Sequence, residues 1–264
     1  MARRIVLTSG KGGVGKTTVC AGLGIALAKR GARVLLVDAD VGLNNLDVAL
    51  GMEGRVVYDM TDVLRGRCSL RQAILQDTEY STLSLLASMR GADDSEFSSA
   101  AFRRMLAEAE GAFDFVLIDC PAGIDNGFHR AVCVADEAIV VTTPHVSAIR
   151  DADKVLSLLG TYDLHEVSVV VNRVRGDLVA GGSMMSAEDI SRLLRHRALG
   201  FIPEDDCVTV YAQLGRLGKG NSRSDMAMAY IAENLISGSR KIYDCTGEYK
   251  GILGKIRTYL RRQI

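Results

Sequence analysis

Short apolar runs rich in β-branched residues alternate along the chain with longer segments of helical periodicity. The runs predict seven strands, at residues 4–8, 33–38, 83–88, 115–119, 138–143, 167–172 and 199–202. Each run is apolar on both faces, which is typical of strands in a parallel sheet that helices cover on both sides. We therefore expect an α/β fold with a doubly wound, mostly parallel, twisted sheet.

Two of the intervening helices have ends that can be read from the residues. Apolar side chains recur at helical spacing over 17–30 and stop at Gly31, whose missing Cβ suits a helix C-terminus. Ser186, with Asp189 three residues later, has the pattern of a capping box that opens a helix over 187–196.

Length and composition indicate one main domain. A chain of 264 residues with 48% hydrophobic content buries one sizeable core, and its three prolines mark no rigid linker. We expect one main domain over 1–245 and a separate C-terminal segment over 249–264. The segment 175–185 is rich in glycine and charge, so we interpret it as a surface loop.

Charge and cysteine content indicate which partners and which cell compartment this protein is expected to have. The 32 basic side chains balance 32 acidic ones, so no net field draws the molecule to nucleic acid, and we expect no specific nucleic-acid partner. The six cysteines form no C-x-x-C pair, which favours reduced thiols in a cytosol. No apolar run approaches the roughly 18 residues of a membrane span, and the first strand begins too early for a signal peptide. These features indicate a cytoplasmic protein.

A phosphate-binding loop is the strongest motif in the sequence. The segment GKGGVGKT at 10–17 satisfies G-x-x-x-x-G-K-[ST] between an apolar strand and a helix, the context that this pattern requires. Glycines let backbone N–H groups wrap a phosphate chain at the helix N-terminus. Lys16 would bridge the β- and γ-phosphates, and the Thr17 hydroxyl would bind Mg²⁺. The candidate nucleotide-binding residues of this loop are Gly10, Lys11, Gly12, Gly13, Val14, Gly15, Lys16, Thr17 and Thr18.

Three aspartates follow apolar runs where an open α/β sheet binds its ligands. Asp119 ends FVLID, as an aspartate of the Walker B type does near a metal. Asp38 and Asp40 end VLLVDAD, and carboxylates on alternate residues of an extended strand can divide metal binding from orientation of a water. An alternative for Asp40 is that it only caps the next turn.

These residues carry a resemblance to a known family. The string KGGVGKTT, with Lys11 ahead of Lys16, resembles the deviant Walker A motif of the MinD/ParA family of P-loop ATPases. Nearly the whole chain is similar to the septum-site-determining branch of that family. The similar strings are VDADVGLNNLDVALG at 37–51, LLASMRGADD at 85–94, VLIDCPAGID at 116–125, ADEAIVVTTPHVSAIRDADKV at 135–155, VVNRV at 170–174 and GFIPED at 200–205.

The resemblance implies a P-loop NTPase-like fold, an ATPase reaction that forms ADP and phosphate, and ATP and Mg²⁺ as cofactors. It implies that Lys11 reaches across an ATP-dependent homodimer to the partner's phosphates. It also implies that Asp40 positions the attacking water and that Asn45 lies in a switch region. The positions that match the family's adenine contacts are Asn172, Pro203 and Asp205.

The sequence also departs from the family pattern at three places. Cys120 stands where the family usually has serine, and His145 where it more often has glutamate. The stretch 208–224 diverges and includes the basic, glycine-rich run LGRLGKGNSR.

The C-terminal segment 249–264 has five basic side chains and no acid. On a helical wheel its apolar side chains fall within an arc of about 140°, the pattern of a helix that lies in a bilayer interface. The candidate membrane-binding residues are Ile252, Leu253, Lys255, Ile256, Arg257, Leu260 and Arg261. The alternative is a terminal helix docked on the domain with its charges in water. The resemblance favours the membrane, because that branch of the family ends in a membrane-targeting helix.

The leading hypothesis is an ATP-dependent, membrane-associating spatial regulator of cell division, peripheral at the inner face of the cell membrane. The resemblance implies a division inhibitor of the MinC type as partner and an activator of the MinE type as a further candidate. Alternatives are a ParA-like DNA-segregation ATPase, which would bind DNA through basic side chains, and a flagellar-number regulator. A fourth is a reductase like the nitrogenase iron protein, with Cys120 and Cys133 holding a cluster between protomers.

Overall fold

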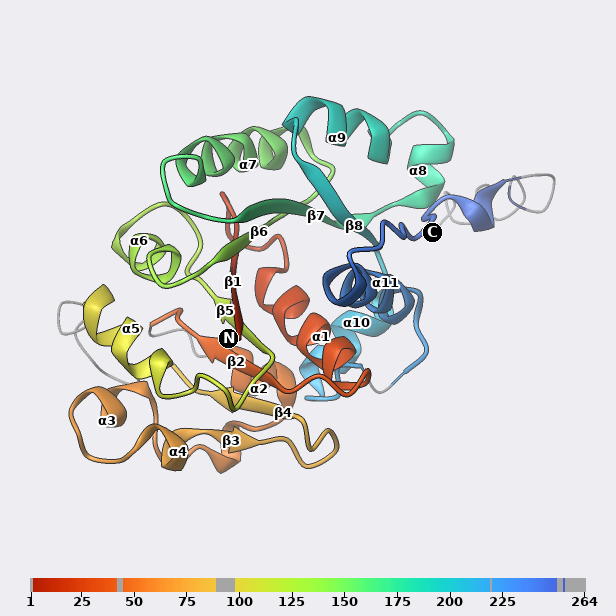
Figure 1. Ribbon diagram of the computed structural model, residues 1–264. Helices are drawn as coiled ribbons and strands as arrows, with labels where there is room; N and C mark the ends of the chain where they lie inside the picture. Colours follow the sequence, from red (N-terminus) through yellow and green to blue (C-terminus); the bar gives the residue numbers. More distant parts are fainter. Residues whose placement is uncertain (1, 42–44, 89–97, 219, 251–253, 255–264) are drawn as a thin grey trace.

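The computed structural model describes residues 2–41, 45–88, 98–218, 220–250 and 254, and these form one eight-stranded sheet between helical layers (Figure 1). The strand order is β3-β4-β2-β5-β1-β6-β7-β8, and every neighbouring pair is parallel except β3 and β4. The strands are β1 Arg3–Thr8, β2 Val34–Asp38, β3 Leu75–Gln76, β4 Leu83–Leu86, β5 Phe115–Asp119, β6 Glu137–Thr142, β7 Glu166–Val174 and β8 Arg197–Pro203.

The predicted doubly wound sheet is confirmed. Each of the seven predicted strands is present, with ends that differ by at most two residues from the predicted ones. The eighth, β3, was not predicted because it has only two residues, too few to show periodicity. It pairs antiparallel with β4 at the edge of the sheet.

Helices cover both faces of the sheet because alternate residues of each strand point to opposite sides. In β1, for example, Val6 packs into one buried cluster, with α5, α6 and α7, whereas Ile5 and Leu7 pack into the other, with α1 and α11. The helices are α1 Lys16–Ala28, α2 Leu46–Leu50, α3 Met60–Leu64, α4 Leu70–Ala73, α5 Ser99–Ala107, α6 Asn126–Val132, α7 Val146–Leu159, α8 Gly176–Ala180, α9 Ala187–Leu194, α10 Asp206–Gln213 and α11 Arg223–Ser237. Two 3₁₀ turns span Glu53–Arg55 and Gly247–Tyr249.

The two helix ends predicted from sequence form as expected. Gly31 has a φ of +83°, and its N–H donates to the carbonyl of Ala28 while the N–H of Ala32 donates to the carbonyl of Leu27. This pair of bonds is the Schellman arrangement that ends α1. At the start of α9, the side chains and backbone N–H groups of Ser186 and Asp189 bond reciprocally in a capping box.

The prediction of a surface loop over 175–185 is wrong in part, because the segment contains α8. Asp177 in its first turn is fully buried and accepts two hydrogen bonds from Arg175. A Cβ on Gly176 would lie 1.8 Å from the carbonyl oxygen of Cys245, so the C-terminal chain passes directly over this helix. Buried packing against that chain explains why a glycine-rich, charged segment becomes helical.

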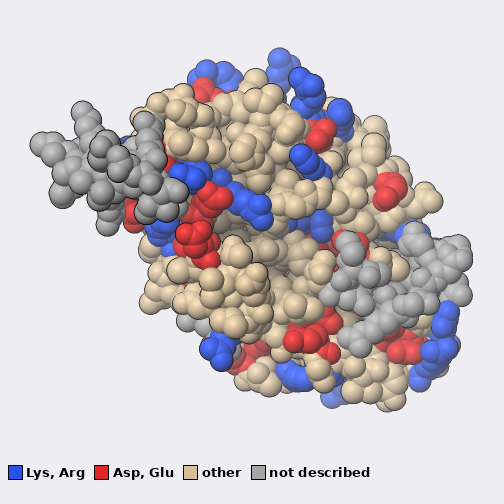
Figure 2. All heavy atoms as spheres, turned by 180° about the vertical axis from the view of Figure 1, so that it is seen from behind, with Lys and Arg blue, Asp and Glu red and all other residues tan. Residues whose placement is uncertain are grey.

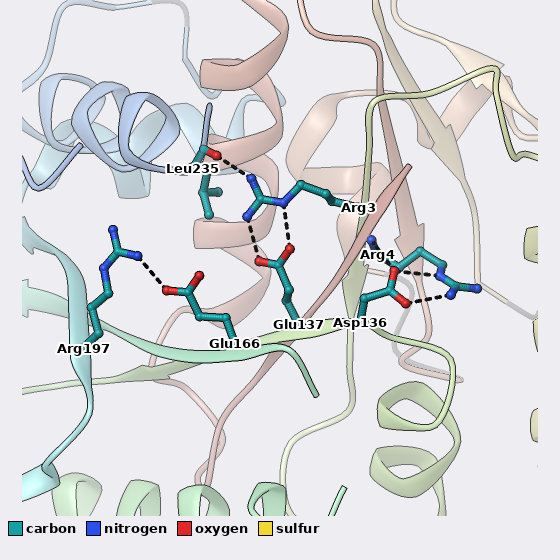
Figure 3. Close-up of polar contacts among 7 residues, drawn as sticks. All are labelled: Arg3, Arg4, Asp136, Glu137, Glu166, Arg197 and Leu235. Carbon is teal, nitrogen blue, oxygen red and sulfur yellow. Dashed lines mark hydrogen bonds and ion pairs between the residues drawn. The ribbon is translucent and has the colours of Figure 1, made fainter. Parts of the chain in front are cut away.

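Ion pairs line the amino ends of β1, β6, β7 and β8 (Figure 3). Arg3 on β1 donates two hydrogen bonds of 2.7 Å to Glu137 on β6 and a third to the carbonyl of Leu235 in α11. Arg197 on β8 pairs with Glu166 on β7 at 2.6 Å. These contacts join neighbouring strands at the end of the sheet opposite to the phosphate loop.

The C-terminal prediction falls mostly on residues outside the described ones. Of the candidate membrane-binding residues Ile252, Leu253, Lys255, Ile256, Arg257, Leu260 and Arg261, none lies within the described part of the chain. In that described part, we find no helix that combines the length and the apolar character needed to cross a bilayer.

Candidate nucleotide-binding site

The predicted site residues gather at the carboxyl end of the sheet. The phosphate loop follows β1, Asp38 ends β2, Asp119 ends β5, and Asn172 lies near the end of β7. The chain passes from β1 to β2 on one side of β1, and later from β5 to β6 on its other side. Open α/β sheets bind ligands at such a reversal of strand order. The fold therefore brings together residues that are far apart in the sequence.

The glycines of the phosphate loop serve two different purposes. Gly13 and Gly15 have φ values of +78° and +89°, a left-handed region that disfavours other residues. A Cβ on Gly10 would lie 2.3 Å from the carbonyl oxygen of Asp151 in α7, so the loop is packed tightly from that side. A Cβ on Gly12 or Gly13 would meet nothing within 4 Å, so this part of the loop faces open space.

Lys16, the first residue of α1, is buried and is held by Asp119. Its Nζ donates a hydrogen bond of 2.7 Å to Oδ1 of that aspartate. Burial opposes the charged lysine, but the Asp119 carboxylate and this hydrogen bond outweigh it and raise the pKa of Lys16. The lysine is therefore a cation fixed at the base of the loop.

Asp38 connects the site to the predicted switch region. Its Oδ1 accepts a hydrogen bond from the N–H of Asp40 at 3.0 Å, and its Oδ2 accepts one from the N–H of Leu46 at 3.3 Å. Burial, reinforced by the Asp119 carboxylate, raises the pKa of Asp38 to about 7. Asn45, predicted to lie in the switch, is the exposed residue that precedes α2, directly before this contact.

Asp40 is half-buried near Lys16, and burial raises the pKa of its carboxyl group. Its backbone is fixed on both sides, since its N–H donates to Asp38 and its carbonyl accepts a 2.9 Å bond from Ser88. The turn that follows Asp40 includes residues 42–44, which lie outside the described part of the chain, so the alternative that Asp40 caps this turn stays a prediction.

A pocket of about 390 Å³, which we name the base pocket, brings the three predicted adenine-contacting residues to the phosphate loop. Asn172, Pro203 and Asp205 line it together with Gly15 and Thr18 of the loop. The Asn172 side chain donates a 2.9 Å hydrogen bond to the carbonyl of Val14, which fixes β7 against the loop. The prediction that these residues share one site is consistent with this geometry.

Sequence reasoning missed one wall of this pocket. Helix α10 contributes Val208, Thr209, Ala212 and Gln213, all within the stretch read only as divergent. The signal that was available is Asp205, which caps α10 by accepting a hydrogen bond from the N–H of Cys207 at 3.2 Å.

A second cavity, of about 410 Å³, lies on the other side of the phosphate loop. Lys11 and His145, both exposed, line it, and we name it the Lys11 cavity. Arg173, which sequence reasoning also missed, lines both this cavity and the base pocket. It has a φ of +56° at an irregularity in the pairing of β7 with β8, and such bulges re-aim side chains next to functional sites.

The residues present fit a Mg²⁺-nucleotide. The open loop offers backbone N–H groups and α1 begins directly behind it, an arrangement that suits phosphate. Asp38 and Asp119 are adjacent across β2 and β5, and carboxylates with a threonine hydroxyl are the oxygen ligands that Mg²⁺ prefers. Thr17 is half-buried in the first turn of α1.

The two cysteines considered for an iron–sulfur cluster do not share a surface. Cys120 is fully buried directly after the carboxyl end of β5, and burial raises the pKa of its thiol to about 12, which opposes the thiolate that a cluster needs. Cys133 lines a cavity with Arg4 and Asp136, at the amino ends of β1 and β6. Cys120 therefore acts as a small buried hydrophobe beside the site.

Comparison with known proteins identifies the family. The family model for the CobQ/CobB/MinD/ParA nucleotide-binding domain matches residues 5–216. The septum site-determining protein MinD of Bacillus subtilis strain 168 is 40% identical over 263 residues, which cover 98% of each chain.

Solved structures agree with the sequence comparison. The MinC:MinD cell division protein complex of Aquifex aeolicus contains a chain that is 40% identical with a TM-score of 0.84, covering 90% of this chain and 97% of that one. MinD of Pyrococcus horikoshii, complexed with Mg-ADP, is 30% identical with a TM-score of 0.80 and the same two coverages. The phosphate loop, the paired aspartates and these relatives together place the chain in the MinD/ParA family of nucleotide-binding proteins, within its septum-site-determining branch.

Proposed function

We propose that this protein is an ATPase that forms a homodimer with ATP, binds the membrane as that dimer and there recruits a division inhibitor. The observation that carries the proposal is the deviant phosphate loop, in which a buried Lys16 lies beside the Walker B-type Asp119 while Lys11 faces an open cavity. The Mg-ADP bound to the P. horikoshii relative supports ATP and Mg²⁺ as ligands of this loop. The A. aeolicus complex supports a partner of the MinC type.

For hydrolysis of ATP to ADP and phosphate, each site residue has a defined task. Lys16 would exchange Asp119 for the β- and γ-phosphate oxygens, and the loop N–H groups would hold the same phosphates. Thr17, Asp38 and Asp119 would hold Mg²⁺, which supplies charge neutralisation when bound. Asp40, with its raised pKa and fixed backbone, would orient the attacking water.

Lys11 is the residue that we propose to act across the dimer. It is exposed and lines the cavity beside the open part of the loop, so a second copy could present its nucleotide there. Lys11→Ala should therefore retain ATP binding as a monomer but fail to dimerise, as measured by light scattering. A normal ATP dimer of this variant would contradict the role in trans.

Asp40→Ala tests the catalytic step. The variant should bind ATP and dimerise but hydrolyse it slowly, so that the dimer persists on the membrane. Ordinary phosphate release by this variant would remove Asp40 from the mechanism.

The membrane part of the proposal rests on the C-terminal sequence. Each cationic residue near an anionic surface contributes about 1 kcal/mol, so one short helix binds marginally. Two tails on one dimer bind more tightly, because the second engages at high effective concentration. ATP-driven dimerisation would then place the protein on the membrane, and hydrolysis would release it.

Sedimentation with anionic liposomes tests the whole proposal. We expect binding with Mg-ATP, weak binding with Mg-ADP, and none for a chain truncated before Tyr249 or for Ile256→Glu with Leu260→Glu. That double variant should still dimerise with ATP, which separates tail function from nucleotide function. Equal sedimentation of every form would reject membrane targeting.

A DNA-segregation role is the main competitor. On the face that Figure 2 shows, Lys and Arg are interspersed with Asp and Glu instead of forming a continuous basic surface. This distribution does not favour DNA on that face. ATP-dependent retention on DNA in moderate salt, without liposome binding, would favour the competing role.

A further inference from the structure

A cavity of about 710 Å³ lies between α8, the start of α9 and the chain segment 242–250. Among the described residues, none lines both this cavity and either the base pocket or the Lys11 cavity. We call it the α8–α9 groove. Polar and apolar residues share its walls, and the apolar ones include Val174, Val179, Ala180, Phe201, Ile242 and Tyr243. The volume is within the range that binds a ligand, and such mixed walls suit an amphipathic one.

The side of the groove formed by the C-terminal chain is firmly fixed. Cys245 passes so close to Gly176 in α8 that no side chain fits between them. Tyr249 is buried, and its hydroxyl accepts a 3.5 Å hydrogen bond from Arg223 of α11. The groove is therefore formed by packed parts of the fold on this side.

The described chain reaches the edge of this groove at residue 250. Lys250 lines it, and Gly254 lies beside it, since a Cβ there would be 2.2 Å from the carbonyl carbon of Tyr249. The apolar residues of the segment 252–264 thus begin two residues beyond the groove wall. So short a connection gives the segment a high effective concentration there and little loop-closure entropy to lose.

Charge at the rim matches the same segment. Glu188 at the start of α9 and Asp244 both line the groove, and Asp244 already pairs with Lys250 at 2.7 Å. Residues 252–264 have only basic charged side chains, on the opposite side of the helical wheel from the apolar ones or at its border. An amphipathic helix could place its apolar face in the groove with cations near these acids.

We propose that residues 252–264 dock in the α8–α9 groove of their own chain whenever they are not on a membrane. The proposal rests on the proposed membrane function, which it deepens by adding a competing, intramolecular site for the tail. Docking multiplies the membrane affinity of a single chain by the fraction of tails that are undocked. Membrane binding then depends more steeply on dimer formation, because two tails must leave their grooves before one dimer is stably attached.

Limited trypsin digestion in the absence of lipid tests docking directly, because the tail offers Lys255, Arg257 and two further arginines. The rate of tail cleavage is followed by intact-mass measurement on the full-length protein. Ala180→Trp should fill the groove, and since Ala180 is exposed at the end of α8, the fold should tolerate it. If nine-tenths of tails are docked, the variant should be cleaved about tenfold faster than the unaltered chain.

Two comparisons separate docking from general loosening of the fold. Ala107→Trp, at an exposed position at the end of α5, is the matched control and should leave the cleavage rate unchanged. Glu188→Gln should accelerate cleavage by a smaller factor that shrinks with added salt. Equal cleavage rates in the unaltered chain and Ala180→Trp overturn the proposal. Protection that increases with protein concentration also overturns it, because the groove would then hold the tail of a second copy.

Liposome sedimentation of the same variants keeps this inference separate from the proposed function. If docking and membrane targeting both hold, Ala180→Trp should bind anionic liposomes in Mg-ADP several-fold more than the unaltered chain. Tail protection without liposome binding in any nucleotide rejects the membrane function alone. Nucleotide-switched liposome binding with an unprotected tail rejects docking alone.

Discussion

The Nζ atom of Lys16 donates a hydrogen bond to Oδ1 of Asp119 at 2.7 Å, and both side chains are buried. The residue expected to bind phosphate is therefore paired with the residue expected to bind the metal. A nucleotide with Mg²⁺ would separate them by giving each a partner of opposite charge. Until a nucleotide binds, the pair holds both side chains in place and their charges cancel.

Lys16→Ala should abolish nucleotide binding and nucleotide-dependent assembly. It should also destabilise the fold by about 3–5 kcal/mol, because it leaves the Asp119 carboxylate buried without a cation. Urea unfolding measures the loss, and binding of a fluorescent ATP analogue measures the function. The double variant Lys16→Ala with Asp119→Ala should be less destabilised than the single one. A single variant as stable as the unaltered chain would show that the buried pair carries no such coupling.

Asp38 makes the stability of the metal-free protein depend on pH. Its folded-state pKa of about 7 is above its ordinary value of 3.8, so folding takes up a proton between these two values. Stability should therefore fall as pH rises from about 4 to about 7 and then level off. Asp38→Asn should weaken this slope and make the protein more stable above pH 7 by up to about 4 kcal/mol, since the pKa rises by about three units at about 1.4 kcal/mol per unit.

The measurement is urea unfolding in EDTA across that pH range. An unchanged slope in Asp38→Asn would show that another group takes up the proton. Because burial is the largest cause of the shift, the variant should be stabilised even at high salt, where screening weakens the Asp119 contribution.

Sequence sufficed for the parts of the molecule that periodicity and local motifs determine. The strands, the phosphate loop and the helix ends at Gly31 and Ser186 were predicted because each depends on neighbouring residues. The short strand β3, helix α8 and the α10 wall of the base pocket were not, because tertiary contacts decide them. Arg173 was not predicted for the same reason. Its position beside both cavities depends on the irregular pairing of β7 with β8, which is a tertiary contact.

Arg173→Gly should weaken nucleotide binding without destabilising the fold. Glycine relieves the left-handed φ of +56°, which for other residues costs about 1 kcal/mol or more, whereas the guanidinium between the two cavities is lost. Arg195→Gly is the matched control, because Arg195 has a φ of +53° at the end of α9 and lines neither cavity. Both variants should keep or raise the melting temperature, and only the first should bind a fluorescent ATP analogue more weakly. Equal nucleotide affinities would assign Arg173 no part in the site.

The ion pair between Arg3 and Glu137 should contribute measurably to stability, unlike the ordinary surface pair. Arg3 bonds Glu137 through two nitrogens and also donates to the Leu235 carbonyl in α11, so it joins β1, β6 and that helix (Figure 3). The Glu137 side chain is only 13% exposed, which limits screening by solvent. A double-mutant cycle of Arg3→Ala and Glu137→Ala should give a coupling energy of about 1–2 kcal/mol.

The same cycle on Arg33 and Asp114 provides the comparison, because that pair is 2.7 Å apart but its side chains are 50% and 43% exposed. Solvent and salt screen such a pair, so its coupling should be smaller and should decline with added salt. If the two cycles gave equal couplings, burial and the contact with α11 would not be what strengthens the Arg3 pair. If the Arg3 coupling held in 1 M salt while the Arg33 coupling vanished, the low exposure of Glu137 would account for the difference.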